Sequence, residues 1–386
     1  MGYRDYSKND FQKLEGQINI MALFGNGVDI QLMDYLNSPY RTTYQNFYNY
    51  LCYKNFDSSN LIFQKMRNDY AIYCQKRGAE KRNWSDFENS LIDIFNETQS
   101  LDIEKLEHDF KVFQIEFSNF LNDIITPQDL AKLGTSSSNE QLAVKTFQEF
   151  LGDLSASDYR KLKFPSKLGH YQLFNWEILN FNYTSLLNNI LTLDKEQYDP
   201  HQHIVSDSQI WFQVNPNNFS NDFISWNSST YFSTYLMTNI DHPHGYQNVP
   251  KSMLFGFDNE NQIINAFNRN FAKQFLKPYW AQNDKKYKSY FNDTDLFIIY
   301  GLSLGVTDFW WWQNILNALL ETDAELIIYN FQTPELDTDV AVINKFITSA
   351  YSGLLSEESR NKLHQKISVV QYTSETKLRA FKLTRD

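Results

Sequence analysis

The sequence has few cysteines and no long apolar run, and each shortage excludes a class of protein. Only 2 of its 386 residues are cysteines, Cys52 and Cys74, which argues against a disulfide-stapled secreted scaffold and fits a reduced cytosol. No segment offers the ~20 consecutive apolar residues of a membrane-spanning helix. The first eleven residues carry four charges and no signal-peptide core. We therefore expect a cytoplasmic protein without a membrane partner.

Basic residues are also in the minority. Lys and Arg number 35 against 46 Asp and Glu, so the net charge of −11 at pH 7 argues against a dedicated nucleic-acid partner. Aromatic residues are plentiful, at 16% of the chain, so the core depends on rings and extensive disorder is excluded. At ~150 residues per domain, the length suggests two or three units.

The chain predicts alternating strands and helices at both ends, with a run of helices between them. After the first strand and helix, residues 42–164 read as helix after helix. Helices are also expected over residues 259–280, 309–320, 340–351 and 357–366. The expected strands cover residues 18–24, 173–181, 210–214, 235–240, 253–255, 296–300, 326–329 and 367–372.

This order predicts an α/β fold with a doubly wound, mainly parallel sheet and a large inserted helical subdomain. Residues 1–41 and 165–386 would form the α/β domain, and residues 42–164 the insertion. Within the insertion, apolar residues at alternating spacings of three and four over residues 103–120 predict a packed helix. Ser85 and Glu88 predict a capping box, and residues 134–139 a loop.

A glycine turn follows the first strand. Gly25 and Gly27 would let the backbone approach a phosphate at the start of a helix, where free amides favour negative charge. Asn26 and Asp29 add polar groups that could reach a ribose or a bound water. A tight turn followed by a first-turn carboxylate explains the same residues without a ligand.

Two further polar clusters follow predicted strands. Asn182 and Thr184 lie in the segment Asn180-Phe181-Asn182-Tyr183-Thr184, and His242 and His244 lie just after the strand 235–240. Ligands of open α/β sheets bind beyond the carboxyl ends of the strands, so these residues are at the correct end for a site. Helix capping is the alternative for Asn182 and Thr184.

The histidines raise the question of a metal. His201 and His203 repeat the spacing of His242 and His244, so a zinc or two-metal hydrolase must be considered. No cysteine lies nearby, and Pro243 between the second pair favours a turn that presents one histidine. We therefore expect no metal.

Gly301, Ser303 and Gly305 spell the nucleophile elbow of the α/β-hydrolases, between a strand and a helix. Only His364 lies downstream of Ser303, on a charged and exposed helix, which argues against a catalytic triad. Ser303, with Asp308 at the start of the next helix, is better suited to holding a sugar or phosphate. A turn with a first-turn acid is again the alternative.

Six short motifs follow one another along the chain, most of them at predicted strand ends. They are Gly25-Asn26-Gly27-x-Asp29, the segment around Tyr44 and Phe47, Asn180 to Thr184, His242-x-His244-Gly245, Leu254-Phe255-Gly256, and Gly301-x-Ser303-Leu304 with Asp308. Taken together and in this order, the motifs resemble the AbiH family of bacterial abortive-infection proteins. That family in turn is similar to the sirtuin-like NAD-binding domains of anti-phage NAD hydrolases. Val28 and Leu302 depart from the residues usual in the family.

The resemblance implies a sirtuin-like fold and hydrolysis of NAD to nicotinamide and ADP-ribose. It implies catalysis by Asn182, which would orient water or the ribose, and by His244 as general base. Thr184 stands where sirtuins carry Asp, and two cysteines cannot form the zinc module of protein deacetylases. The implied ligand contacts are Gly25, Asn26, Gly27, Asp29, Thr184, His242, Gly301, Ser303 and Asp308.

The partners to consider are the nucleotide, a phage-derived trigger and a second copy of the chain. Two other functions stay open. One is a metal-dependent nuclease or phosphodiesterase that uses the four paired histidines. The other is a sensor that binds nucleotide without turnover.

Overall fold

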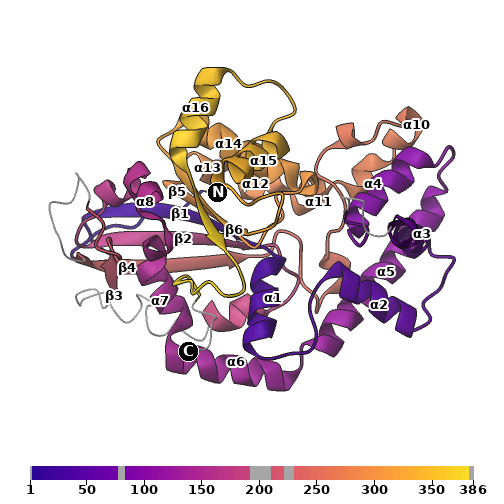
Figure 1. Cartoon of the computed structure of the whole chain (residues 1–386), viewed down its shortest axis with the longest axis horizontal. Helices are drawn as coiled ribbons and strands as arrows, with labels where there is room; N and C mark the ends of the chain where they lie inside the picture. The colour runs from indigo at the N-terminus through magenta and orange to yellow at the C-terminus, as the bar shows by residue number, and fades with distance from the viewer. Residues whose placement is uncertain (1, 77–82, 192–209, 221–229, 382–386) are drawn as a thin grey trace.

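A computed structural model describes residues 2–76, 83–191, 210–220 and 230–381 of the chain. Its centre is a seven-stranded sheet in the order β3-β4-β2-β1-β5-β6-β7 (Figure 1). All neighbours pair in parallel except β3 and β4. The predicted mixed α/β fold with a mainly parallel sheet is therefore confirmed. The strands are β1 Gly16–Phe24, β2 Gln172–Asn180, β3 Ile210–Gln213, β4 Tyr231–Asp241, β5 Leu296–Tyr300, β6 Glu325–Phe331 and β7 Ile367–Tyr372.

The central strands are buried on both faces, as their unbroken apolar sequences predict. In β1, Ile20 and Ala22 belong to the core on one face, and Met21 and Leu23 to the core on the other. This alternation follows from the two-residue period of a strand. On the second face, the helix α14 (Phe309–Glu321) contributes the buried Trp311 and other large apolar side chains.

The strand order reverses at β1. The chain runs from β1 to β2 and β4 on one side, and then returns to β5, β6 and β7 on the other. In parallel sheets a crevice opens at such a reversal, outside the carboxyl ends of the strands. The loops after β1 and β5 therefore meet at the place where a ligand site is expected.

Helices fill the chain between β1 and β2, and we refer to those after α1, within residues 42–164, as the helical segment. Figure 1 shows α2 to α5 beyond the end of the sheet where α1 begins. The ring of Phe147 in α7 lies 4.8 Å from that of Trp176 in β2, so the last of these helices also cover the sheet. The proposed domain boundaries stay a prediction. The helices are α1 Asn26–Tyr35, α2 Tyr44–Tyr53, α3 Leu61–Gln75, α4 Phe87–Glu97, α5 Ile103–Ile124, α6 Pro127–Glu140, α7 Leu142–Glu149 and α8 Ala156–Lys161.

Several expected elements differ in the structure. Residues 253–255 form no strand, and residues 259–280 form short helices instead of one long helix. Asn265 accepts from the amides of Phe267 and Asn268 and so starts a new helix, and Pro278 starts another. The remaining helices are α10 Ala266–Arg269, α11 Lys277–Ala281, α12 Asn283–Lys286, α13 Lys288–Phe291, α14, α15 Asp339–Ala350 and α16 Glu357–Lys366.

Two local predictions in the helical segment are wrong. The predicted loop at residues 134–139 lies inside α6. The predicted capping box does not form, because Asp86 rather than Ser85 caps α4, by accepting from the amide of Asn89. Ser85 bonds Asn83 instead, which leaves Glu88 available for another contact. Across the parts of the chain that the structure describes, no helix has the length and apolar character needed to cross a membrane.

Candidate functional site

A cavity of about 400 Å³ lies at the carboxyl ends of β1, β2 and β5. Its other wall comes from the helical segment, with residues at the starts of α2 and α4 and on one side of α5. Segments far apart in the sequence therefore build one site. Nine of the residues singled out from the sequence line it, namely Gly25, Asn26, Asp29, Asn182, Thr184, His244, Gly301, Ser303 and Asp308.

Asp29 is the centre of a buried polar cluster. Asn182 Nδ2 donates to its Oδ1 at 3.1 Å, and Thr184 Oγ1 donates to its Oδ2 at 2.6 Å. Asn182 Nδ2 also donates to the carbonyl oxygen of Gly25 at 3.1 Å. Burial raises the pKa of Asp29 to about 7, although the bond from Thr184 opposes the shift. The sequence motifs after β1 and β2 thus form one hydrogen-bonded unit.

The glycine turn makes a backbone hydrogen bond between the loops after β1 and β5. The amide of Gly27 donates to the carbonyl oxygen of Gly301 at 2.9 Å, so it is not free for a phosphate as the sequence suggested. Gly301 has a φ of +72°, and a Cβ on Gly27 would lie 2.6 Å from Gly301 Cα. These two glycines are therefore required by the close approach of the β1 and β5 loops.

Asn26 links the first turn of α1 to the helical segment. Its Nδ2 donates to the carbonyl oxygen of Thr42 at 3.1 Å, and its Oδ1 accepts from the Thr42 hydroxyl at 2.5 Å. Ser303, in the loop after β5, is exposed and lines the cavity. The side chain of Asn26 is thus already engaged, whereas Ser303 is exposed at the cavity wall.

The two histidines after β4 point to different partners. His242 Nδ1 lies 2.9 Å from the carbonyl oxygen of Asn182, and its Nε2 lies 2.9 Å from Asn188 Oδ1. The lining of the cavity does not include His242. Burial lowers the pKa of His242 to about 4. Its ring therefore supports the loop that carries Asn182.

His244 lines the cavity and is almost fully buried. Its ring packs edge-on against Phe181, with 4.9 Å between ring centroids. Its Nε2 lies 3.7 Å from Asp308 Oδ1 and has no hydrogen-bond partner among the described residues. Burial, with a smaller contribution from Lys277, lowers its pKa to about 3. The imidazole is therefore neutral at cellular pH, because its pKa lies well below the ordinary histidine value of ~6.5.

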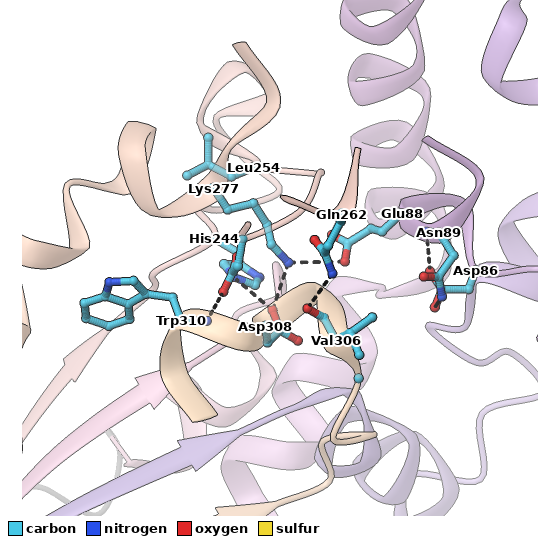
Figure 2. A network of polar contacts seen from close by, with 12 residues as sticks. Asp86, Glu88, Asn89, His244, Leu254, Gln262, Lys277, Val306, Asp308 and Trp310 are labelled. Atoms are coloured by element: carbon cyan, nitrogen blue, oxygen red, sulfur yellow. Dashed lines mark hydrogen bonds and ion pairs between the residues drawn. The ribbon is translucent and has the colours of Figure 1, made fainter. Parts of the chain in front are cut away.

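Figure 2 shows a charge network behind His244 that sequence reasoning missed. Lys277 Nζ lies 2.8 Å from Asp308 Oδ1 and 3.3 Å from Glu88 Oε2. Burial lowers the pKa of Lys277, but these carboxyl groups raise it more strongly, to well above its ordinary value. Local sequence gave no signal for this lysine, because its two partners are distant in the chain.

The carboxyl groups around Lys277 differ in the direction in which their pKa is shifted. Burial raises the pKa of Asp308, but Lys277 and His244 lower it more, so that it remains below its usual value. Burial raises the pKa of Glu88 to about 8 and that of Asp258 well above its ordinary range. At neutral pH the ammonium of Lys277 is therefore balanced mainly by the carboxylate of Asp308.

A second cavity, of about 720 Å³, lies on the other side of the α1 N-terminus. It shares Asn26, Gly301, Leu302 and Ser303 with the smaller cavity. Gly27, the remaining predicted contact apart from His242, lines this larger space. Its walls are mostly aromatic and aliphatic, and include Tyr300, Tyr329, Phe331, Tyr372 and Phe381.

Only one of the two histidine pairs considered for a metal site, His242 and His244, lies in the described part of the chain. His201 and His203 lie outside the described residues. Within the described ranges, no group of three or more His, Cys, Asp or Glu side chains is placed to hold a metal ion.

Comparison with known proteins gives one finding. A family model described as "Bacteriophage abortive infection AbiH" matches residues 21–330, which is most of the chain and includes every residue that lines the smaller cavity. No curated protein matches the sequence.

Proposed function

The chain belongs to the bacteriophage abortive infection AbiH family, and from this premise we propose that its cavities bind NAD or a related nucleotide and that the smaller cavity hydrolyses NAD. The family suggests a role in abortive-infection defence against phage. Hydrolysis of NAD would supply the damage to the infected cell. The proposal includes the relationship to sirtuin-like domains, which the β1 glycine turn, Asn182 and His244 support by their positions.

The pair of neighbouring cavities is the observation that carries the proposal. A dinucleotide has two ends linked by a diphosphate, and this site has two spaces that share Asn26, Gly301 and Ser303 in their walls. The larger aromatic space suits the adenine half, because rings offer stacking surfaces. The smaller polar space suits the nicotinamide ribose. The diphosphate would cross at the Ser303 hydroxyl, since the Gly27 amide is occupied.

The reaction needs a proton acceptor but no acid. The bond between ribose C1′ and the nicotinamide nitrogen breaks, and its electron pair stays on that nitrogen, so nicotinamide leaves uncharged. Water forms the new bond to C1′, and its proton passes to Nε2 of neutral His244. Asp308, 3.7 Å away, would stabilise the resulting imidazolium.

Asp29 and Asn182 would act on the ribose. The transition state resembles an oxocarbenium ion, and a nearby carboxylate stabilises its positive charge. With a pKa of about 7, Asp29 is partly ionised at cellular pH. Asn182 holds the Asp29 carboxylate and lines the cavity, so it would orient a ribose hydroxyl or the water. His242 would position Asn182 rather than contact the ligand.

The test measures nicotinamide and ADP-ribose by liquid chromatography. Full-length wild type, His244→Ala and Asn182→Ala would be compared as purified proteins, and in cells before and after phage challenge. Loss of a general base lowers the rate by ~10²–10⁴-fold. His108→Ala is the matched control, because His108 is exposed on α5. Stable NAD in wild-type cells that nevertheless block phage would refute hydrolysis.

Binding without turnover is the second candidate. The low pKa of His244 favours it, because an imidazole that titrates near 3 is a weak base in the empty cavity. Isothermal titration calorimetry with NAD would separate the two. Binding by wild type with no nicotinamide released, even from phage-challenged cells, would favour the sensor.

A further inference from the structure

Lys277 is a buried cation behind the smaller cavity, and the reaction above gives it no role. Its side chain is only 1% exposed, and it binds Asp308 from the β5 loop and Glu88 from α4. Removing an ammonium group from water is costly unless its partners are held in good geometry. A lysine in this environment therefore fixes the positions of the carboxyl groups that it binds.

Asp308 Oδ1 connects Lys277 to His244. The oxygen that accepts from Lys277 at 2.8 Å is the same oxygen that lies 3.7 Å from His244 Nε2. Because Lys277 holds this atom, a negative charge stays beside the nitrogen that would receive the proton. Without Lys277, the buried carboxylate would lose its counter-ion and would either turn or take up a proton.

Helix α4 is linked to the loop that carries Asp308 by two routes, and Figure 2 shows the one that runs from Glu88 through Lys277. Glu88, in its first turn, binds Lys277. Near its other end, Asn96 Nδ2 donates to the carbonyl oxygen of Gln262 at 3.1 Å. Gln262 Nε2 in turn donates to the carbonyl oxygen of Val306 at 3.0 Å, two residues before Asp308. A shift of α4 would therefore act on Asp308 both through Lys277 and through the backbone.

We infer that Lys277 is a positioning residue for the pair of His244 and Asp308, and that its bond to Glu88 makes the geometry of this pair depend on α4. The inference rests on the proposed function, in which His244 accepts a proton. It identifies a route by which a ligand of the helical segment would switch the site: displacement of α4 removes Glu88 from Lys277 and loosens Asp308.

The experiment follows His244 by NMR in the full chain labelled with ¹⁵N-histidine, with its ring signals identified by their loss in His244→Asn. Lys277→Met removes the charge at similar length, and Glu88→Ala cuts the link to α4. Glu88→Gln retains a hydrogen-bonding side chain and is the conservative variant. Lys273→Met is the control, because Lys273 is exposed nearby. Thermal denaturation of each variant reports folding.

We expect the Nε2 resonance of His244 to move in Lys277→Met and Glu88→Ala, and to keep its wild-type position in Glu88→Gln and Lys273→Met. With NAD as substrate, kcat should fall about tenfold or more in Lys277→Met, with KM little changed, because Lys277 does not touch the substrate. A folded Lys277→Met with wild-type His244 signals and kcat overturns the inference. If that variant does not fold, wild-type signals in Glu88→Ala overturn it. A wild type that never releases nicotinamide refutes the proposed function, while the His244 spectrum still decides this inference.

Discussion

Replacing Asp29 by Asn should stabilise the protein at high pH and abolish activity. Burial raises the pKa of Asp29 from 3.8 to about 7, so the folded state disfavours the carboxylate. The carboxyl group of Asp29 therefore destabilises the fold progressively as the pH rises from the unfolded-state pKa of 3.8 toward the folded-state pKa of about 7. At 1.36 kcal/mol per pH unit, the cost at pH 8 is about 4 kcal/mol. At pH 5 it is only about 1.5 kcal/mol, because this pH lies only about one unit above the unfolded-state pKa of 3.8.

An asparagine would remove this cost and keep the local bonds. Its oxygen can accept from Asn182, and its amide can donate to the Thr184 hydroxyl, which then accepts. Urea denaturation of wild type and Asp29→Asn at pH 5 and pH 8 measures the effect. The gain in stability should be larger at pH 8 by about 2 to 3 kcal/mol. NAD hydrolysis should be lost, because the neutral amide cannot stabilise positive charge on the ribose.

Asp34→Asn, on the exposed side of the same helix, is the control. Asp34 pairs with Arg41 at the surface, so its replacement should cost under ~1 kcal/mol. If Asp29→Asn destabilises the protein equally at both pH values, the carboxyl group is ionised without penalty and our account of the buried cluster is wrong.

Two further predictions concern the loops after β1 and β5. Gly27→Ala should destabilise the protein by ~1–3 kcal/mol, because its methyl group would meet the backbone of Gly301. Gly169→Ala has open space around its Cβ and should change the free energy of unfolding by less than ~0.5 kcal/mol, and urea denaturation compares the two. Ser303→Trp should place a bulky ring in the wall that the two cavities share, so NAD binding measured by calorimetry should be lost. Its melting temperature should stay near that of wild type because Ser303 is exposed; unchanged NAD binding would contradict the two-cavity account.

The sheet and the polar residues at the carboxyl ends of its strands could be predicted from the sequence, and the reason is physical. Buried parallel strands are unbroken apolar runs, and parallel strands bring their carboxyl ends to one edge. Polar residues such as Asp29 and Asn182 that directly follow such runs can therefore be placed together without knowledge of the packing. Both line one cavity in the structure.

What the sequence could not predict depends on contacts between distant segments. Glu88 fits a local capping pattern, yet its carboxyl group binds Lys277, 189 positions away. The long predicted helix over residues 259–280 fails because its polar side chains cap short turns that pack against α4. Gly27 matches a phosphate turn, yet its amide is used by Gly301. In each case a tertiary partner competes successfully with the local pattern.

The pairing of β1 with β2 has a consequence for synthesis of the protein. Gly16 pairs with Gln172, so the two central strands join only after the whole helical segment has left the ribosome. The smaller cavity also needs Asp308, and thus more than 300 of the 386 residues must be made before it is complete. Long-range pairing of this kind is slow to form. A nascent or truncated chain therefore lacks part of the cavity, which, under the proposed hydrolysis of NAD, would protect the cell from early loss of its own nucleotide pool.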